Sequence, residues 1–101
     1  DPRPKIPGER AIWLSKRGAA RLAMNHQPDA RADLEAALAI ESPAWIQGRT
    51  RINLGKLHDL AGRRADALRE YRQAVELCRR DDDGLGVNEA NRWMRRPFAF
   101  D

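Results

Sequence analysis

The sequence predicts an all-α domain, and three observations support this prediction. Apolar side chains recur at helical spacing along most of the 101 residues. Alanine, the strongest helix former, occurs 16 times. No segment alternates polar and apolar side chains for long enough to indicate a strand. Because a chain of this length makes about one domain, we expect a single helical domain with a thin core.

The first two helices are bounded by clear signals. The first is expected from Glu9 to about Met24, where the polar segment 25–27 interrupts the periodicity. The second begins at Pro28, whose fixed φ and missing N–H suit a first helical turn, and continues to about Ile40. The side chains expected to face inward are Leu14, Gly18, Leu22, Ala30, Leu34, Ala37 and Leu38.

The third helix is expected from Ala44 to about Ala61, with Ser42 as its cap and Pro43 in its first turn. Gly62 ends it, because glycine tolerates the positive φ that follows many helices. Its buried stripe is expected to contain Ile46, Thr50, Leu54, Leu57 and Ala61.

The fourth helix is expected over 64–79, a polar turn over 81–86 and a short fifth helix over 87–96 before Pro97. The apolar positions of the fourth helix are Ala67, Leu68, Tyr71, Ala74, Val75 and Leu77. Residues 1–8 are proline-rich and predict an extended linker, followed by one domain at 9–101.

The strongest signal is an internal repeat. Segments 28–40 and 65–77 align at a constant offset of 37 residues, and each follows another helix and a short turn. A helix-turn-helix unit that recurs at such a period indicates stacked helical repeats. The matched pairs are Ala30 with Ala67, Leu34 with Tyr71, Ala37 with Ala74, Leu38 with Val75, and Ile40 with Leu77.

The second unit resembles a tetratricopeptide repeat, whose pattern is W-x2-L-G-x2-Y, then A-x3-F, then P. Leu54 and Gly55 occupy the L-G pair, Ala67 the alanine position and Tyr71 the aromatic position. The chain departs from the pattern where it carries Arg51, His58 and Arg79 in place of tryptophan, tyrosine and proline. In the first unit, Arg17 and Arg21 stand at positions that are usually apolar.

The resemblance implies two stacked hairpins, a fragment of an α-α superhelix, with repeat one at 9–43 and repeat two at 44–81. The helix at 87–96 would cap the stack with an apolar face that includes Trp93. The resemblance also suggests a short module at the C-terminal end of a larger bacterial protein.

In that family the first helix of each unit lines a concave groove that holds a peptide or a partner protein. Carried over to this chain, the groove residues are Ile12, Ser15, Ala19, Leu22, Arg49, Ile52, Asn53, Lys56 and Asp59. The mixture of apolar and cationic positions suits an acidic or carboxylate-bearing peptide. The carboxylate clamp of chaperone-binding members is not expected, because Ser15 and Ala19 replace its lysine and asparagine and only Asn53 matches.

The residues indicate no enzyme, no cofactor and no metal site. His26 and His58 have no ligands at metal-binding spacing, Cys78 is interpreted as a buried apolar residue, and the acidic run 81–83 is interpreted as a solvated turn. No apolar run approaches the roughly 18 residues of a membrane span. No signal-peptide pattern is present, and nothing in the chain indicates a compartment.

Two alternatives to peptide binding remain. The module could cap or dimerise a neighbouring domain or a second copy, because two repeats are fewer than the usual minimum of about three. Nucleic-acid binding is the least favoured, because the 16 arginines are dispersed and Trp13, Trp45 and Trp93 fit apolar helix faces.

Overall fold

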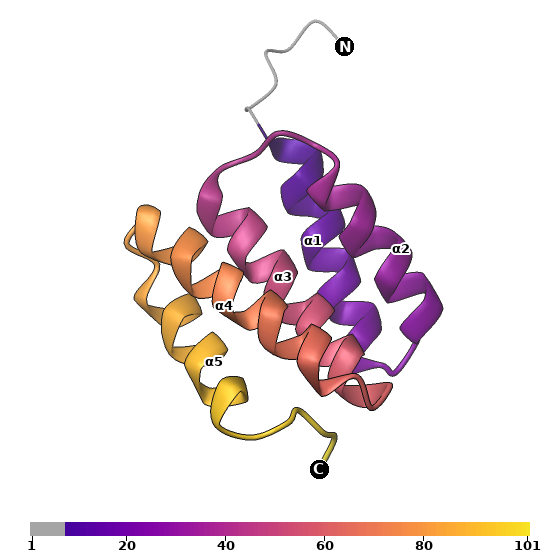
Figure 1. Cartoon of the computed structure of the whole chain (residues 1–101). Coiled ribbons are helices and arrows are strands. Elements are labelled where there is room, and N and C mark those ends of the chain that lie inside the picture. The colour runs from indigo at the N-terminus through magenta and orange to yellow at the C-terminus, as the bar shows by residue number, and fades with distance from the viewer. Residues whose placement is uncertain (1–7) are drawn as a thin grey trace, which may run out of the picture.

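The chain folds into α-helices joined by short turns, as shown by a computed structural model that describes residues 8–101 (Figure 1). The all-α prediction is confirmed, with no strand in that range. The linker expected at 1–8 lies outside the described residues except for Gly8. This glycine directly precedes the first helix and has a φ of 80°. The helices are α1 (Glu9–Ala23), α2 (Gln27–Leu38), α3 (Ala44–Leu60), α4 (Arg64–Arg80) and α5 (Gly84–Arg95).

The ends of α1 to α4 lie within two residues of the predicted ends. Gly62 has a φ of 76° and follows α3, as its position predicts. The start of α5 was placed too late: the helix begins at Gly84, because the Asp83 carboxylate accepts a hydrogen bond from the backbone N–H of Gly86 at 3.3 Å. The polar turn is therefore shorter than expected.

Ser42 does not cap α3, contrary to the prediction. Pro43 is the N-cap residue, and the Ser42 hydroxyl is buried with no hydrogen-bond partner among the described residues. A carboxylate from the end of α4 acts at this helix start instead, because the Trp45 N–H donates to Asp81 at 2.9 Å. This contact joins positions 36 residues apart, so sequence spacing gives no sign of it.

Helix α3 is the centre of the arrangement. It packs on all four other helices, whereas in the described part of the chain no Cα atom of α1 lies within 8 Å of one in α5, nor does one of α2 lie so close to α4. Consecutive helices lie side by side, from α1 and α2 at one end to α5 at the other (Figure 1).

Two buried clusters lie on opposite sides of α3. One joins α3 to α1 and α2 through Leu22, Ala30, Leu34, Leu54 and Leu57. The other joins α3 to α4 and α5 through Ile52, Ala67, Tyr71, Ala74, Val75, Ala90 and Trp93. Most predicted core positions fall in one of these clusters.

Two assignments to apolar faces are wrong. Ala61 is exposed rather than buried. Trp13 is 52% exposed and stacks on the Arg17 guanidinium, whose central carbon lies 4.3 Å from the ring centroid. Helical periodicity marked Trp13 as part of an apolar stripe, but the hairpin partner α2 lies on another side of α1.

Two glycines allow the paired helices to approach closely, at positions 37 residues apart. A Cβ added at Gly18 would lie 2.8 Å from Cδ2 of Leu34, and one added at Gly55 would lie 2.8 Å from Cδ1 of Tyr71. Both distances are shorter than van der Waals contact, so each large side chain fills the space that a glycine leaves. The repeat seen in the sequence therefore corresponds to the same helix contact made twice.

The arginines at usually apolar positions are paired. Arg17 donates two hydrogen bonds to the Asp33 carboxylate, each of 2.8 Å, and Arg21 donates a third at 3.0 Å. Asp33 is only 4% exposed, so its charge is compensated inside the α1–α2 hairpin. Arg51 pairs across the second hairpin with the partly exposed Glu70 through one hydrogen bond of 2.8 Å.

Asp59 joins three segments at the far end of α3. Its carboxylate, 1% exposed, accepts hydrogen bonds from the Tyr71 hydroxyl at 2.7 Å, the Phe98 backbone N–H at 2.9 Å and the Arg64 guanidinium at 3.0 Å. Burial raises the pKa of Tyr71, as does this hydrogen bond, so the hydroxyl remains a donor. Arg64 also donates to the carbonyl oxygens of residues 93–94 at 2.8 and 3.0 Å, which holds the last turn of α5.

The close contact of α3 and α4 predicts opposite effects for two glycine substitutions. Gly55→Ala should lower the free energy of unfolding by about 1–3 kcal/mol, because the Tyr71 ring is fixed by its bond to Asp59 and cannot move aside. Gly84→Ala should leave it unchanged or raise it by up to about 1 kcal/mol, because no atom lies within 4 Å of the new methyl group. Urea unfolding followed by circular dichroism measures both, and equal effects would contradict the proposed packing.

Candidate functional site

A groove runs between α1 and α3, with one residue of α5 at its edge. It encloses about 280 Å³. Its wall is apolar toward Ile12 and Ile46 and polar toward Asn53 and Lys56. The remaining lining residues are Ser15, Lys16, Ala19, Trp45, Arg49 and Glu89.

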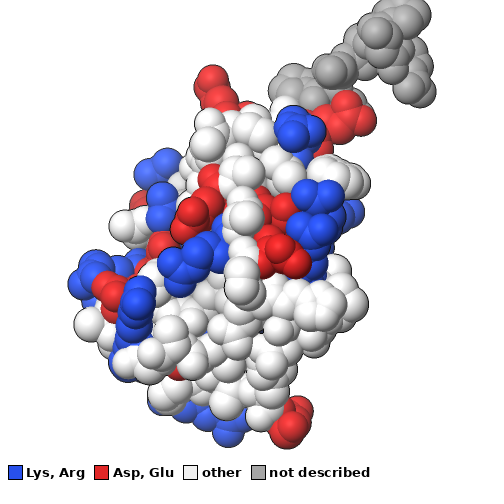
Figure 2. Space-filling view, turned by 90° about the vertical axis from the view of Figure 1, so that its right-hand side faces the viewer, with Lys and Arg blue, Asp and Glu red and all other residues white. Residues whose placement is uncertain are grey.

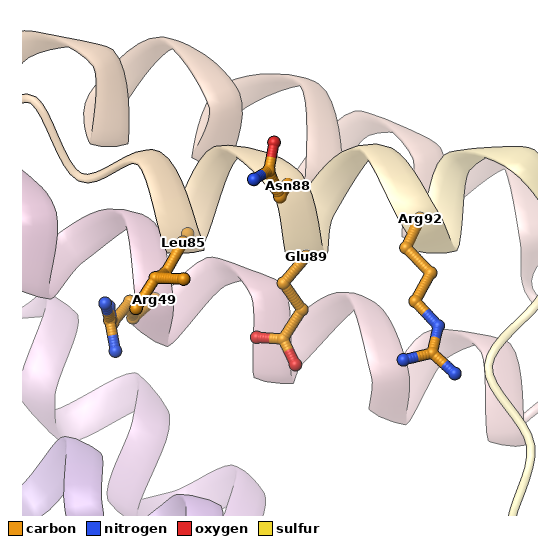
Figure 3. A pocket seen from close by; sticks show the side chains of 6 residues that line it. Arg49, Leu85, Asn88, Glu89 and Arg92 are labelled. Atoms are coloured by element: carbon orange, nitrogen blue, oxygen red, sulfur yellow. The ribbon is translucent and has the colours of Figure 1, made fainter.

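A second cavity of about 380 Å³ continues the groove between α3 and α5. In Figure 3, Glu89 and Arg92 project from α5 toward α3, whereas Asn88 points the other way. Arg49 and Glu89 line both cavities, so the two are neighbours on one surface, which we call the α1–α3–α5 groove. Leu85 and Gly86 complete the second cavity.

The structure brings most of the predicted groove residues together. Ile12, Ser15, Ala19, Arg49, Asn53 and Lys56 all line the α1–α3 cavity. Leu22 and Ile52 do not, because they are 3% and 0% exposed inside the two buried clusters. Asp59 also lies outside, since its carboxylate is bonded to the α4 and tail groups described above.

Several groove residues were missed from the sequence. Lys16 follows Ile12 by four positions, and Trp45 precedes Arg49 by four, so helical spacing alone could have identified both. Glu89 and Arg92 were missed because α5 was interpreted only as a cap. Their role in the groove depends on the contact between α5 and α3.

Cations predominate among the charged lining residues. Arg49 is fixed by Asp83 through two hydrogen bonds of 2.7 Å, and Lys56 donates to Glu89 at 3.1 Å. Lys16 and Arg92 form no ion pair within residues 8–101. The groove therefore presents excess positive charge at both flanks.

Asp83 holds Arg49 in place and also begins α5. The Arg49 hydrogen bonds keep the pKa of Asp83 below its usual value, against an opposing effect of burial. The same bonds raise the pKa of Arg49. The run 81–83 is thus more than the solvated turn expected from the sequence, because Asp83 ties α3 to α5.

The Ser15 hydroxyl in the groove is already bonded to the buried Thr50 beneath it. Ser15 and Thr50 lie 2.8 Å apart and link α1 to α3, and Thr50 donates to the Ile46 carbonyl at 2.7 Å. The groove can therefore offer charge, amide groups and apolar surface to a ligand through non-covalent contacts.

Other candidate sites show no chemistry of their own. Cys78 is 0% exposed, as predicted, and lies where a Cβ on Gly48 or Gly86 would meet its sulfur. Burial raises the pKa of this thiol to about 11, so it stays protonated at neutral pH. No group of three His, Cys, Asp or Glu side chains is gathered for a metal in residues 8–101. None of the described helices combines the length and apolar character of a membrane span.

Charges of both signs cover the surface on the α2 side of the molecule. Figure 2 shows basic and acidic side chains interspersed over the upper and middle part of this face and a largely uncharged lower part. Nucleic-acid binding sites usually gather cations into one patch. This face does not provide one.

Comparison with known proteins found no match: no family model fits the chain, and neither a curated protein nor a solved structure is significantly similar to it.

The Arg49–Asp83 pair predicts a specific pH dependence. Because the pKa of Asp83 is lowered in the folded state, its stabilising effect is complete above the unfolded value of about 3.9 and is lost as the pH falls through the lower folded value. Asp83→Asn should therefore be less stable than wild type at pH 7, and the difference should shrink below about pH 4. Because asparagine still caps α5, the difference in urea unfolding midpoint between wild type and this variant, measured from pH 7 to 2, reports the contribution of the ion pair alone. A difference that stays constant with pH would contradict this assignment.

Proposed function

We propose that the chain is a non-catalytic protein-interaction module built like a pair of tetratricopeptide repeats, and that its α1–α3–α5 groove binds an extended peptide or a segment of a partner protein. The observation that carries this proposal is the groove itself, formed by the first helix of each unit together with α5. Binding would need no bond to be made or broken, only a rigid surface for the ligand.

The helix contacts support a stack of repeats. Each hairpin has a glycine in its first helix that faces a large side chain in its second, Gly18 with Leu34 and Gly55 with Tyr71. The first helix of the second hairpin, α3, contacts both helices of the first. Stacked repeats bury a continuous core in this way, each unit contacting its neighbours.

The position of α5 supports its role as a capping helix. Its apolar residues Ala90 and Trp93 are buried against α3 and α4, while the polar residues Asn88 and Arg95 are exposed. Trp93 also packs edge to face on Phe98 of the tail, with ring centroids 5.0 Å apart. A terminal helix with a polar outer face would keep the end of the stack in water.

The charges favour a ligand with acidic side chains. Lys16 on α1 and Arg92 on α5 flank the groove, and its apolar wall at Ile12 and Ile46 lies beside Lys16. An extended peptide that alternates apolar and acidic residues would match both features, because its successive side chains point to opposite sides.

Fluorescence anisotropy with a labelled peptide of about ten residues that alternates Leu and Glu tests this proposal. We expect saturable binding that weakens with added salt, and weaker or no binding of the matching Leu-Gln and Leu-Lys peptides. Lys16→Gln and Arg92→Gln should each weaken binding about two- to fivefold. Arg72→Gln, which removes an exposed arginine from α4, should not.

Failure of all three peptides to bind the folded protein, or equal binding of all three, would contradict the proposed function.

An architectural or dimerising role is the second candidate, and exposed apolar side chains on α1 and at its C-cap favour it. Trp13 and Met24 are 52% and 59% exposed, and the exposed Ala20 lies between them. Light scattering from micromolar to millimolar concentration would then show self-association, and Trp13→Gln would abolish it. A mass that stays monomeric over this range would count against dimerisation.

A further inference from the structure

Glu89 is the one acidic side chain among the lining residues that the structure gives to the two cavities, and it lines both of them. It extends from α5 toward α3, between Arg49 and Arg92 in the view of Figure 3. Its carboxylate accepts a hydrogen bond from the Lys56 ammonium at 3.1 Å. A negative charge of the chain itself therefore lies in the middle of a cationic groove.

This carboxylate can leave its position more easily than the other acidic group nearby. The Glu89 side chain is 44% exposed and has one bond to the groove, so water competes for it. Asp83 is 11% exposed, makes two bonds to Arg49 and caps α5, which fixes it. Only Glu89 can therefore move away without breaking a helix cap.

Lys56 would remain in place after Glu89 left. Its side chain is 14% exposed, and its ammonium lies 5.1 Å from the centre of the Phe98 ring and 5.8 Å from that of Trp93. Aromatic faces attract a cation at these distances. The ammonium group is thus a preformed site for one carboxylate, and in this structure Glu89 occupies it.

We propose that Glu89 is a built-in competitor: its carboxylate occupies the position on Lys56 that a carboxylate of an acidic peptide takes on binding. This inference rests on the proposed groove function and specifies the ligand as an extended peptide with acidic side chains. Glu89 lowers the affinity of the groove for such a peptide by holding Lys56.

The charge-neutral variant Glu89→Gln tests the proposal with the same Leu-Glu probe. We expect it to bind about two- to fivefold more tightly than wild type. Glu76→Gln, which removes an exposed carboxylate from α4, is the matched control and should change the affinity by less than about 1.5-fold, because salt screens a distant charge. The Leu-Gln probe should bind Glu89→Gln and wild type equally.

Lys56→Met separates competition for the ammonium from a general change in charge. In the Lys56→Met background, Glu89→Gln should give little or none of the gain seen with Lys56 present. The proposal is overturned if Glu89→Gln matches Glu76→Gln, if it weakens binding, or if the gain persists without Lys56.

The same titrations distinguish this inference from the groove function. If the probe binds wild type and Glu89→Gln equally well, the groove function stands and the competitor role fails. If the probe binds neither, the groove function fails and the competitor role fails with it. Measurable binding to wild type and tighter binding to Glu89→Gln support both.

Discussion

The structure depends on the close approach of α3 and α4, where the Tyr71 ring lies against Gly55 and its hydroxyl is bonded to Asp59 one turn further along α3. A side chain at position 55 would hold the helices apart, and without the bond to Asp59 the buried hydroxyl would lack its partner. Asp59 also accepts the Phe98 N–H, so the same contact fixes where the tail lies. While held in this way by α4, α3 also packs on α1 and α5, and the groove lies between these three helices.

The first hairpin solves the same packing problem with different chemistry. Gly18 and Leu34 make the close contact, but Arg17 and Arg21 surround Asp33, whereas Leu54 and His58 occupy the corresponding positions 37 residues later and Glu70 is paired with Arg51. Breaking a buried pair by removing one partner leaves an uncompensated charge, so such a group can fix the register of two helices. Charged residues at usually apolar positions therefore need not reduce the stability of a hairpin when they form ion pairs between its two helices.

Local signals predicted the helices well and the site only in part. Periodicity, Pro28 and Gly62 placed four helices, because helix starts and stops are determined by nearby residues. The start of α5 depends on which of three adjacent aspartates accepts the Gly86 N–H, and their order in the sequence does not show this. Leu22 and Ile52 were misplaced, and Glu89 was missed, because exposure on α1, α3 and α5 depends on contacts between helices far apart in the chain.

In the described residues α1 and α5 have no Cα atoms within 8 Å of one another, so α3 is the helix that packs on both ends of the molecule. A ligand that contacts both flanks of the groove would add a second connection between them, outside the covalent chain. Local opening of either end would then require release of the ligand as well as loss of packing on α3. Occupancy of the groove would thereby couple the two ends of the molecule more tightly than α3 does alone.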